Sequence, residues 1–257
     1  MLLAVDIGNT DVTFGIFEDD KLLTRFHFSV GAYRTSDEYG MLICNIINLK
    51  KFDINSIGHV IISSVVPKIM YSFRKAIMKY IGCEPIMVGA GIKTGLKIAT
   101  INPRETGPDR IVDAVAAYEL YGGPIVVIDY GTATTYDYIS EDGTFEGGVI
   151  SPGMKISAKA LWNDTANLPE IEIKAVDKII GKETVASMQS GLFYGMVGQS
   201  KFIINNIKNE TGRKDIKVVA TGGLGKIISD NTDEIDIYDP DLTLKGLQIL
   251  FKKQGGR

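Results

Sequence analysis

The sequence predicts an α/β protein made of two similar lobes. Residues 2–30 contain three strand-like segments joined by tight turns, and the residues that follow alternate between helical and strand periodicity. Residues 124–151 repeat the three-strand pattern, and the same 123 positions separate Asp6 from Asp129 and Glu18 from Glu141. Because this offset is kept through a whole hairpin, we interpret the chain as an internal duplication.

The first lobe is expected to span residues 1–117 and to contain a mixed sheet flanked by helices. Short apolar runs bounded by turn residues predict strands at 2–5, 12–16, 21–30, 59–63 and 85–88. Apolar residues near helical spacing predict helices at 37–48 and 67–81. Pro67 suits the first position of the second of these helices, because a proline there loses no hydrogen bond.

The second lobe is expected to span residues 118–257 and to have the same architecture. A helical stretch at 113–121 leads into it. The predicted strands lie at 125–128, 134–139, 144–150 and 218–221, and a helix is predicted from Thr184 onward. The strand at 218–221 ends in small polar residues, as the strand at 61–64 does, which extends the duplication beyond the hairpin.

Composition limits the classes of function. Hydrophobic residues make up 45% of the 257 residues and charged residues 23%, values typical of a globular protein. The formal net charge of -3 provides no general attraction for nucleic acid, so we expect no nucleic-acid partner. No apolar run approaches the ~20 residues that a bilayer span requires. We therefore expect no membrane association and a cytoplasmic protein.

Both predicted hairpins turn at an Asp-x-Gly sequence, first in residues 6–10 and again in residues 129–132. Glycine lets the backbone approach a polyphosphate closely, and neighbouring N–H and hydroxyl groups can donate to phosphate oxygens. An aspartate at the strand end can hold Mg²⁺, directly or through water. One such turn is also an ordinary hairpin feature. Two copies in duplicated lobes favour a phosphate clamp.

Several sequence blocks resemble those of a known family. Two Asp-x-Gly hairpins in duplicated lobes resemble the phosphate loops of the superfamily that contains actin, the heat-shock chaperone ATPases and the sugar kinases. Within it, the chain is similar to the type III pantothenate kinases across nearly its whole length, through blocks at residues 6–10, 107–110, 129–134, 147–153, 165–169 and 181–184. The resemblance implies two ribonuclease H-like lobes and an ATP-dependent kinase that phosphorylates pantothenate to 4'-phosphopantothenate, the first step of coenzyme A biosynthesis.

The resemblance also implies roles for individual residues. The first phosphate loop for ATP would consist of Asp6, Ile7, Gly8, Asn9, Thr10, Asp11, Val12 and Thr13, with Thr132 contacting ATP from the second turn. Pantothenate would be bound by Gly107, Pro108, Asp109, Arg110 and Thr184. Asp109 would be the general base, and Asp129 would hold a monovalent cation (K⁺ or NH₄⁺). From its place at the strand end, independently of the resemblance, Asp6 is expected to hold Mg²⁺, directly or through water. Members of this family are homodimers, so a homodimer is implied too.

Alternatives to these roles remain open on the residues alone. Asp109 could accept the proton of an attacking hydroxyl, or it could only cap the helix that begins near Arg110. Arg110 could bind a substrate carboxylate, or it could pair with Glu105 or Asp113. The glycines at 191, 195 and 198 of the helix from Thr184 could serve close helix packing, contact a ligand directly, or form part of the dimer surface.

The chain departs from the family pattern at two positions. Thr100 stands about where a tyrosine is often found, and Thr13 stands where the first phosphate loop often ends in lysine. One substrate contact and one phosphate contact would then come from elsewhere. Two other functions are consistent with the fold: a kinase for a different small hydroxylated metabolite such as a sugar, and a non-catalytic regulatory protein of the actin-like type.

Overall fold

A computed structural model describes residues 1–31 and 33–256 of the chain, and it divides into two compact units. The first unit contains Met1–Gly95, Asn102–Ala116 and Leu242–Arg257, and the second contains Leu96–Ile101 and Ala117–Asp241. The units differ from two contiguous lobes, 1–117 and 118–257, in two segments. The C-terminal segment packs on the first sheet, and residues 96–101 add a strand to the second sheet.

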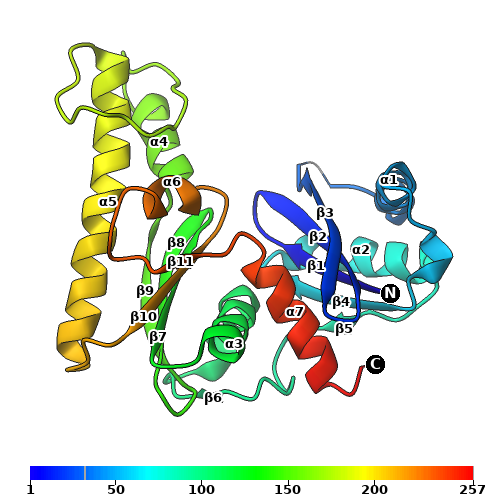
Figure 1. Ribbon diagram of the computed structural model, residues 1–257. Helices are drawn as coiled ribbons and strands as arrows, with labels where there is room; N and C mark the ends of the chain where they lie inside the picture. Colours follow the sequence, from blue (N-terminus) through cyan, green and yellow to red (C-terminus); the bar gives the residue numbers. More distant parts are fainter. Residues whose placement is uncertain (32, 257) are drawn as a thin grey trace. The chain divides into compact units, whose positions relative to one another are not determined.

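Sheet A, in the first unit, has five strands in the order β3-β2-β1-β4-β5 (Figure 1). The strands are β1 (Leu2–Ile7), β2 (Asp11–Glu18), β3 (Lys21–Ser29), β4 (His59–Ser64) and β5 (Ile86–Met87). The first three pair antiparallel, whereas β4 and β5 add in parallel. Parallel addition puts the carboxyl ends of β1 and β4 at the same edge of the sheet, where Asp6 lies.

The two faces of sheet A have different partners. The helices are α1 (Ser36–Leu49), α2 (Pro67–Tyr80) and α7 (Leu242–Lys253), with short 3₁₀ turns at Ile54–Ser56 and Pro103–Glu105. Alternate residues of β1 and β2, such as Val5 and Phe14, join a buried core with α1 and α2. On the other face Leu244 of α7 approaches Gly15 so closely that a Cβ there would lie 3.1 Å from Leu244 Cδ1. Asp6 projects from this second face, because it is out of phase with Val5.

Sheet B, in the second unit, repeats this order and adds one strand, giving β11-β10-β7-β8-β9-β6. The strands are β6 (Lys97–Ile98), β7 (Ile125–Tyr130), β8 (Ala133–Ile139), β9 (Thr144–Pro152), β10 (Lys217–Thr221) and β11 (Ile237–Tyr238). Strands β7, β8 and β10 pair as β1, β2 and β4 do, and β7 begins 123 residues after β1. The predicted α/β class and the duplication are confirmed.

Helices α4 (Met154–Asn163), α5 (Thr184–Glu210) and α6 (Gly225–Ser229) belong to the second unit, while α3 (Pro108–Tyr121) begins in the first unit and ends in the second. The core of sheet B combines Val126 and Ile128 of β7 with Phe193 of α5. Ser200 of α5 is hydrogen-bonded to two buried tyrosines, Tyr130 at 2.8 Å and Tyr136 at 3.1 Å. This face of β7 is therefore fixed to α5, and Asp129 projects from the opposite face.

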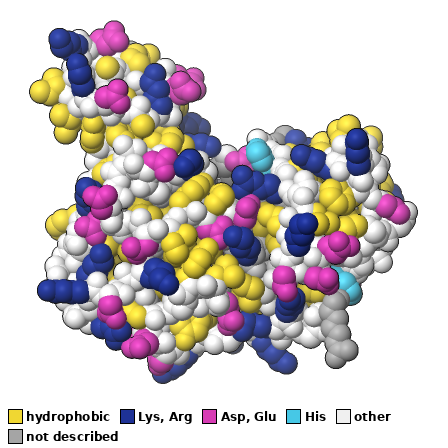
Figure 2. Space-filling view, viewed as in Figure 1, with side chains coloured by type: hydrophobic (Ala, Val, Ile, Leu, Met, Phe, Trp, Pro, Cys, Tyr) yellow, Lys and Arg dark blue, Asp and Glu magenta, His cyan; other side chains and the backbone are white. Residues whose placement is uncertain are grey.

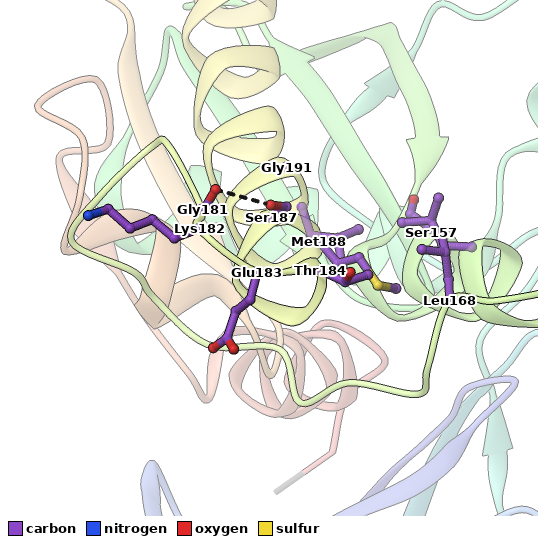
Figure 3. Close-up of a pocket in the computed structure, with 11 residues that line it drawn as sticks. Ser157, Leu168, Gly181, Lys182, Glu183, Thr184, Ser187, Met188 and Gly191 are labelled. Carbon is purple, nitrogen blue, oxygen red and sulfur yellow. Dashed lines mark hydrogen bonds between the residues drawn. The ribbon is translucent and has the colours of Figure 1, made fainter.

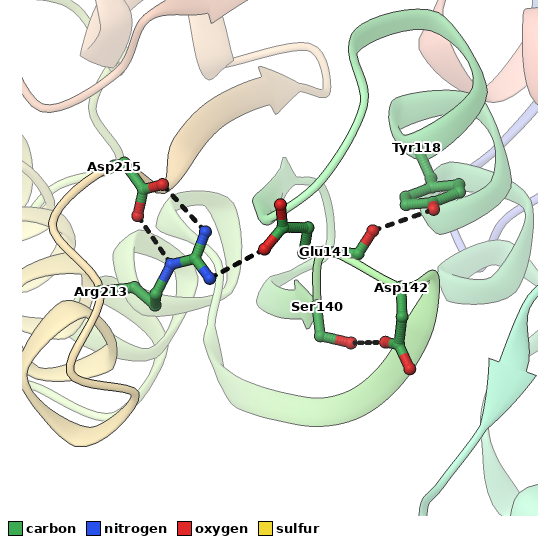
Figure 4. A network of polar contacts seen from close by, with 6 residues as sticks. All are labelled: Tyr118, Ser140, Glu141, Asp142, Arg213 and Asp215. Carbon is green, nitrogen blue, oxygen red and sulfur yellow. Dashed lines mark hydrogen bonds and ion pairs between the residues drawn. The ribbon is translucent and has the colours of Figure 1, made fainter.

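A polar network holds the β8–β9 turn (Figure 4). The Arg213 guanidinium donates to both oxygens of Asp215 at 2.8 and 2.9 Å and to Glu141 at 3.0 Å. Tyr118 of α3 donates to the Glu141 carbonyl oxygen at 3.1 Å, and Ser140 donates to Asp142 at 2.6 Å. Exposed ion pairs contribute little free energy singly, so the effect of this network is mainly to set the geometry of the turn.

The predicted helices and strands are found with small shifts at their ends. The helix predicted at 113–121 begins earlier, at Pro108, so Asp109 and Arg110 lie inside its first turn. The strand predicted at 125–128 continues to Tyr130, so Asp129 is the penultimate residue of a strand and not part of the turn itself. Within the described residues, no helix has both the length and the apolar character needed to cross a membrane.

Candidate functional site

The first Asp-x-Gly turn connects β1 to β2. The Gly8 N–H donates to the Asp11 carbonyl oxygen at 3.0 Å, and the Val30 N–H donates to the Thr10 carbonyl oxygen at 2.8 Å. These bonds close the turn and tie it to the end of β3. Asn9 and Thr10 are exposed at its tip. The turn therefore presents backbone and small polar groups to solvent, as a phosphate loop requires.

The residues predicted for this loop separate into two sets. Asp11 and Thr13 alternate with Val12, and Thr13 is in register with Asp6, so these polar side chains share one face of sheet A. Ile7 and Val12 are fully buried in the core with α1 and α2. Any contact that Ile7 or Val12 makes with a ligand would come from the backbone, since their side chains point away from this face.

Asp6 and Asp109 form an interacting pair of carboxylates in the first unit. The pKa of Asp6 is raised to about 7, mainly by burial and to a smaller extent by the charge of Asp109. The nearby Ser63 hydroxyl opposes the shift. A carboxyl group that is hard to ionise beside a second carboxylate is typical of a site that receives a cation or a proton.

Asp109 is the second residue of α3. Its Oδ1 accepts a hydrogen bond from the Arg110 N–H at 2.9 Å. Gly107 lies so close that a Cβ there would overlap Asp109 Oδ1. The helix start therefore holds the carboxylate in one orientation, and a role in capping coexists with proximity to Asp6. The alternatives for the Arg110 side chain stay open.

The second turn connects β7 to β8 and is enclosed by glycines. The Gly131 N–H donates to the Ala133 carbonyl oxygen at 3.1 Å, and the Gly153 N–H donates to the Thr132 carbonyl oxygen at 3.2 Å. A Cβ at Gly153 would lie 2.5 Å from the Thr132 carbonyl oxygen, so only glycine fits there. Helix α4 begins at the next residue without a side-chain cap, and its first N–H groups face this end of the turn.

Two glycines, Gly131 and Gly222, lie close to the Asp129 carboxylate. A Cβ at Gly131 would lie 3.0 Å from Asp129 Oδ2. Gly222 has φ +88°, and a Cβ on it would overlap Asp129 Oδ1 and lie 2.7 Å from the backbone of Tyr130. The carboxylate is therefore packed against backbone on both sides. Glycine at both positions therefore keeps side chains away from this carboxylate.

Thr184 opens α5 and lines a groove in the second unit (Figure 3). The groove has a volume of about 840 Å³ and lies between α4, the start of α5 and the segment before it. Ser187 closes one side by donating to the Gly181 carbonyl oxygen at 3.4 Å. Lys182 and Glu183 are at its rim, so the groove offers charged and hydroxyl groups together.

The glycines of α5 do not serve packing within the chain. Gly191, Gly195 and Gly198 are all exposed, and a Cβ on any of them would meet open space. Phe202, which is 71% exposed, lies on the same face of the helix. Close packing against another part of the same chain is thus contradicted for the described residues. The other two readings from sequence, a direct contact with a ligand and a dimer surface, stay open, and Gly191 lines the groove.

The donor set for metal ions is sparse. Across residues 1–31 and 33–256, no group of three or more His, Cys, Asp or Glu side chains is arranged to hold a metal ion. Mg²⁺ in phosphoryl-transfer sites is held by one or two carboxylates together with phosphate oxygens and water. Asp6 and Asp109, with the raised pKa of Asp6 and the buried Ser63 hydroxyl beside them, fit that kind of site.

Three residues of these sites were not among the predicted ones: Ser63, Gly153 and Gly222. Ser63 and Gly222 lie in the strand ends whose similarity suggested the longer duplication, so that similarity is the signal that could have found them. Gly153 lies in a sequence block already noted, but its contact with the β7–β8 turn depends on a fold that brings residues 21 positions apart together. Sequence spacing does not encode that approach.

Known proteins resemble this chain over nearly its whole length. The family model "Type III pantothenate kinase" matches residues 2–206. An Agathobacter rectalis protein named type III pantothenate kinase is 57% identical over 254 residues, covering 99% of this chain and 98% of that protein. A Campylobacter jejuni structure described as a conserved Baf family transcriptional activator superposes with a TM-score of 0.61 at 22% identity, over 98% of each chain.

A further structure, described as an N-acetylglucosamine kinase from Porphyromonas gingivalis, has a TM-score of 0.51 at 13% identity and covers 99% of this chain and 100% of that one. At such identities the structures show the fold alone. The duplicated sheets, each with a strand-end aspartate, define the fold class that this chain shares with those two structures. Within that class, the chain belongs to the type III pantothenate kinase family, as the resemblance predicted.

Proposed function

We propose that this protein transfers the γ-phosphoryl group of ATP to the primary hydroxyl of pantothenate, forming 4'-phosphopantothenate for coenzyme A biosynthesis. The observation that carries the proposal is the Asp6–Asp109 pair beside an exposed Asp-x-Gly turn, in a chain that is 57% identical to a named pantothenate kinase. A phosphate loop and a carboxylate near it are the two parts that an alcohol kinase requires.

Asp109 is proposed as the general base. The pantothenate hydroxyl would give its proton to the Asp109 carboxylate while its oxygen forms the new bond to the γ-phosphorus, and the bond to the ADP oxygen breaks. The first turn of α3 and Gly107 hold that carboxylate in place. The remaining residues predicted for pantothenate are Pro108, Arg110 and Thr184, of which Arg110 suits the carboxylate end of the substrate.

Asp6 is proposed to bind Mg²⁺ with the nucleotide, directly or through water. When bound, the ion would neutralise charge on the transferring phosphoryl group. Burial and the charge of Asp109 disfavour the ionised form of Asp6. A bound cation would favour that form, so the surroundings of Asp6 support a role in binding one. Residues 8–13 and Thr132 are proposed to contact ATP phosphates through backbone N–H and hydroxyl groups.

Asp129 is proposed to hold a monovalent cation, K⁺ or NH₄⁺. Its support is the cradle of Gly131 and Gly222, which leaves room for backbone but not for side chains beside the carboxylate. Asp129→Asn should raise the K⁺ concentration needed for half-maximal activity several-fold and leave the melting temperature close to that of the parent. Activity of the parent that is unchanged when a bulky organic cation replaces K⁺ would contradict this assignment.

A homodimer through α5 is proposed as the working assembly. Glycine lowers helix stability by roughly 1 kcal/mol relative to alanine, so three exposed glycines on one face of α5 need a reason outside the chain. Exposed Ile179 and Ile180 precede the helix, in the part of the second unit where Figure 2 shows hydrophobic side chains among charged ones. Apolar and small residues together suit close approach by a second copy.

The function is tested by ATP-dependent phosphorylation with purified protein. Pantothenate should be phosphorylated, while glucose, N-acetylglucosamine and N-acetylmannosamine at equal concentrations should not. A protein that phosphorylates one of the sugars in preference to pantothenate would contradict the proposal and favour the alternative kinase.

The assembly is tested separately by sedimentation and activity at the same protein concentration. Gly195→Asp should dissociate the dimer and lower activity, although Gly195 takes part in no chemistry. The control is Glu210→Lys, a change of charge at an exposed residue near the other end of the same helix. A fully active parent monomer would contradict the dimer.

A further inference from the structure

The strand beside β1 places a buried hydroxyl group next to Asp6. Ser63 is in register with Asp6 across the parallel β1–β4 pair, so both side chains project from the same face of sheet A. Ser63 is fully buried, and its Oγ has no hydrogen-bond partner of ordinary geometry among the described residues. Buried hydroxyl groups almost always have a partner, so this exception needs an explanation.

A structural role in starting α2 does not account for Ser63. The neighbouring Ser64 takes that role, because its Oγ accepts the Val66 N–H at 3.1 Å just before the helix begins at Pro67. The groups next to Ser63 along β4 on its own face are apolar, such as Ile61. The Asp6 carboxyl is close enough for the Ser63 hydroxyl to lower its pKa by favouring the ionised form.

The second unit contains the same arrangement. Thr221 ends β10, is 2% exposed, and is in register with Asp129 across the parallel β7–β10 pair. Strand β10 starts 158 residues after β4, whereas the hairpins are 123 residues apart, because the connections before these strands differ in length. A hydroxyl residue beside the strand-end aspartate is thus present in both copies although the chain between them has changed.

We propose that Ser63 is a positioning residue: its hydroxyl donates to the ionised Asp6 carboxylate and fixes the orientation in which Asp6 meets the magnesium ion of bound nucleotide. The inference rests on the proposed nucleotide site at the β1–β2 turn. It assigns Ser63 no contact with substrate and no part in proton transfer.

The test is calorimetric binding of ADP to the full-length protein, once with Mg²⁺ and once with a chelator. Ser63→Ala should weaken Mg²⁺-dependent binding by about tenfold, the size expected for one lost hydrogen bond to a charged group. Binding without Mg²⁺ should change less than twofold, because Ser63 acts only through Asp6. Ser63→Thr, which restores the hydroxyl as in Thr221, should recover binding to within twofold of the parent.

A double-mutant cycle separates positioning from a general effect on folding. In an Asp6→Asn background, Ser63→Ala should cause no further loss, since the group that it positions is gone. Ser229→Ala is the matched control, because Ser229 Oγ is also buried without a partner among the described residues but lies in α6 of the other unit. It should bind Mg²⁺·ADP as the parent does.

Three results would overturn the proposal: parental binding by Ser63→Ala, an equal loss with and without Mg²⁺, or an additive loss in the Asp6→Asn background. The readout is nucleotide binding, not turnover. A parent that binds Mg²⁺·ADP but does not phosphorylate pantothenate would refute the proposed function. The role of Ser63 could still be tested, because the parent and the Ser63 variants could be compared in their binding of Mg²⁺·ADP. A parent that binds no Mg²⁺·ADP would overturn both.

Discussion

The β1–β2 hairpin and the β7–β8 hairpin share strand order and a strand-end aspartate, yet the two aspartates have different surroundings. The turns also differ in length by one residue, because Asp6 pairs with Thr13 whereas Asp129 pairs with Thr135. Asp6 is close to a second carboxylate, Asp109, and its turn is open at the tip. Asp129 is packed against the backbone of Gly131 and Gly222, and its turn is covered by Gly153. The duplicated backbone has therefore been kept while the groups that approach each aspartate have diverged.

This difference has a chemical meaning. Two carboxylates that repel each other are stabilised by a divalent ion or by a proton, so the first hairpin suits chemistry in which charge moves. At the second hairpin, the close approach of Gly131 and Gly222 restricts the space around the Asp129 carboxylate. We therefore expect phosphoryl transfer to take place near the first hairpin and a monovalent cation to stay bound at the second. The predictions below challenge this division.

The largest expected effect is at Asp109. Asp109→Asn keeps the oxygen that accepts the Arg110 N–H but loses the proton acceptor, so kcat for pantothenate phosphorylation should fall by ~10²–10⁴-fold. The loss of stability should be near the low end of the ~0.5–2 kcal/mol range for lost caps. The measurements are steady-state kinetics and thermal unfolding of the parent and the variant.

Binding of ATP is the internal control for Asp109, since general-base catalysis leaves nucleotide affinity nearly unchanged. A well-folded Asp109→Asn protein with near-parental kcat would show that Asp109 only holds the start of α3. No proton acceptor would then be identified near the first hairpin, and the two hairpins would no longer differ in this respect.

A smaller effect is expected at Gly222. Gly222→Ala forces a Cβ into a position with φ +88° against Asp129 and Tyr130, which should cost about 1–2 kcal/mol in backbone strain and displace the carboxylate. Activity at low K⁺ should fall about tenfold or more and recover partly at high K⁺, as expected if the ion is bound less tightly. The measurement is the K⁺ dependence of kcat together with the melting temperature.

The neighbouring glycine provides the matched control for Gly222. A Cβ at Gly223 would meet open space, so Gly223→Ala should leave both the K⁺ dependence and the melting temperature close to those of the parent. Equal behaviour of the two variants would show that Asp129 is not confined by backbone in the way described, and the two hairpins would then be more alike than their geometry indicates.

The sequence predicted the hairpins better than it predicted their surroundings. Alternation of apolar residues and the 123-residue offset are local signals, and they located β1, β2, β7 and β8 to within a few residues. The interaction of Asp6 with Asp109 joins residues about 100 positions apart, so no periodicity reports it. The sequence predicts a role for each of the two residues and does not predict that they interact.

The elements that were missed are short or depend on tertiary contacts. Strands β6 and β11 have two residues each and are held by pairing with β9 and β10, not by their own sequence pattern. Helix α7 has an ordinary amphipathic sequence, and its position on sheet A cannot be read from it, because Gly15 and Leu244 meet across more than 200 residues. Long-range packing decides these features.

The last expected effect is on the pH dependence of stability in the absence of nucleotide and metal, and it concerns protein stability alone. The pKa of Asp6 is raised from its ordinary value of 3.8 to about 7. Between these values the folded protein holds a proton that the unfolded chain has released, so the contribution of Asp6 to stability decreases as pH rises from about 4 to about 7 and is constant above. Asp6→Asn cannot ionise and should lack this decrease.

The measurement is the difference between melting temperatures at pH 5.5 and pH 8, compared between the parent and each variant in chelator-treated buffer. The parent should melt at a lower temperature at pH 8 than at pH 5.5. Asp6→Asn should make this difference smaller, and Asp109→Asn should reduce it by less, because burial is the largest cause of the raised pKa of Asp6 and the charge of Asp109 the second. Asp233→Asn, at an exposed carboxylate of the other unit, is the control and should keep the parental difference. If Asp6→Asn keeps it too, Asp6 is ionised throughout this range. The first hairpin would then hold an ordinary carboxylate, and what distinguishes it from the second would reduce to the position of Asp109 alone.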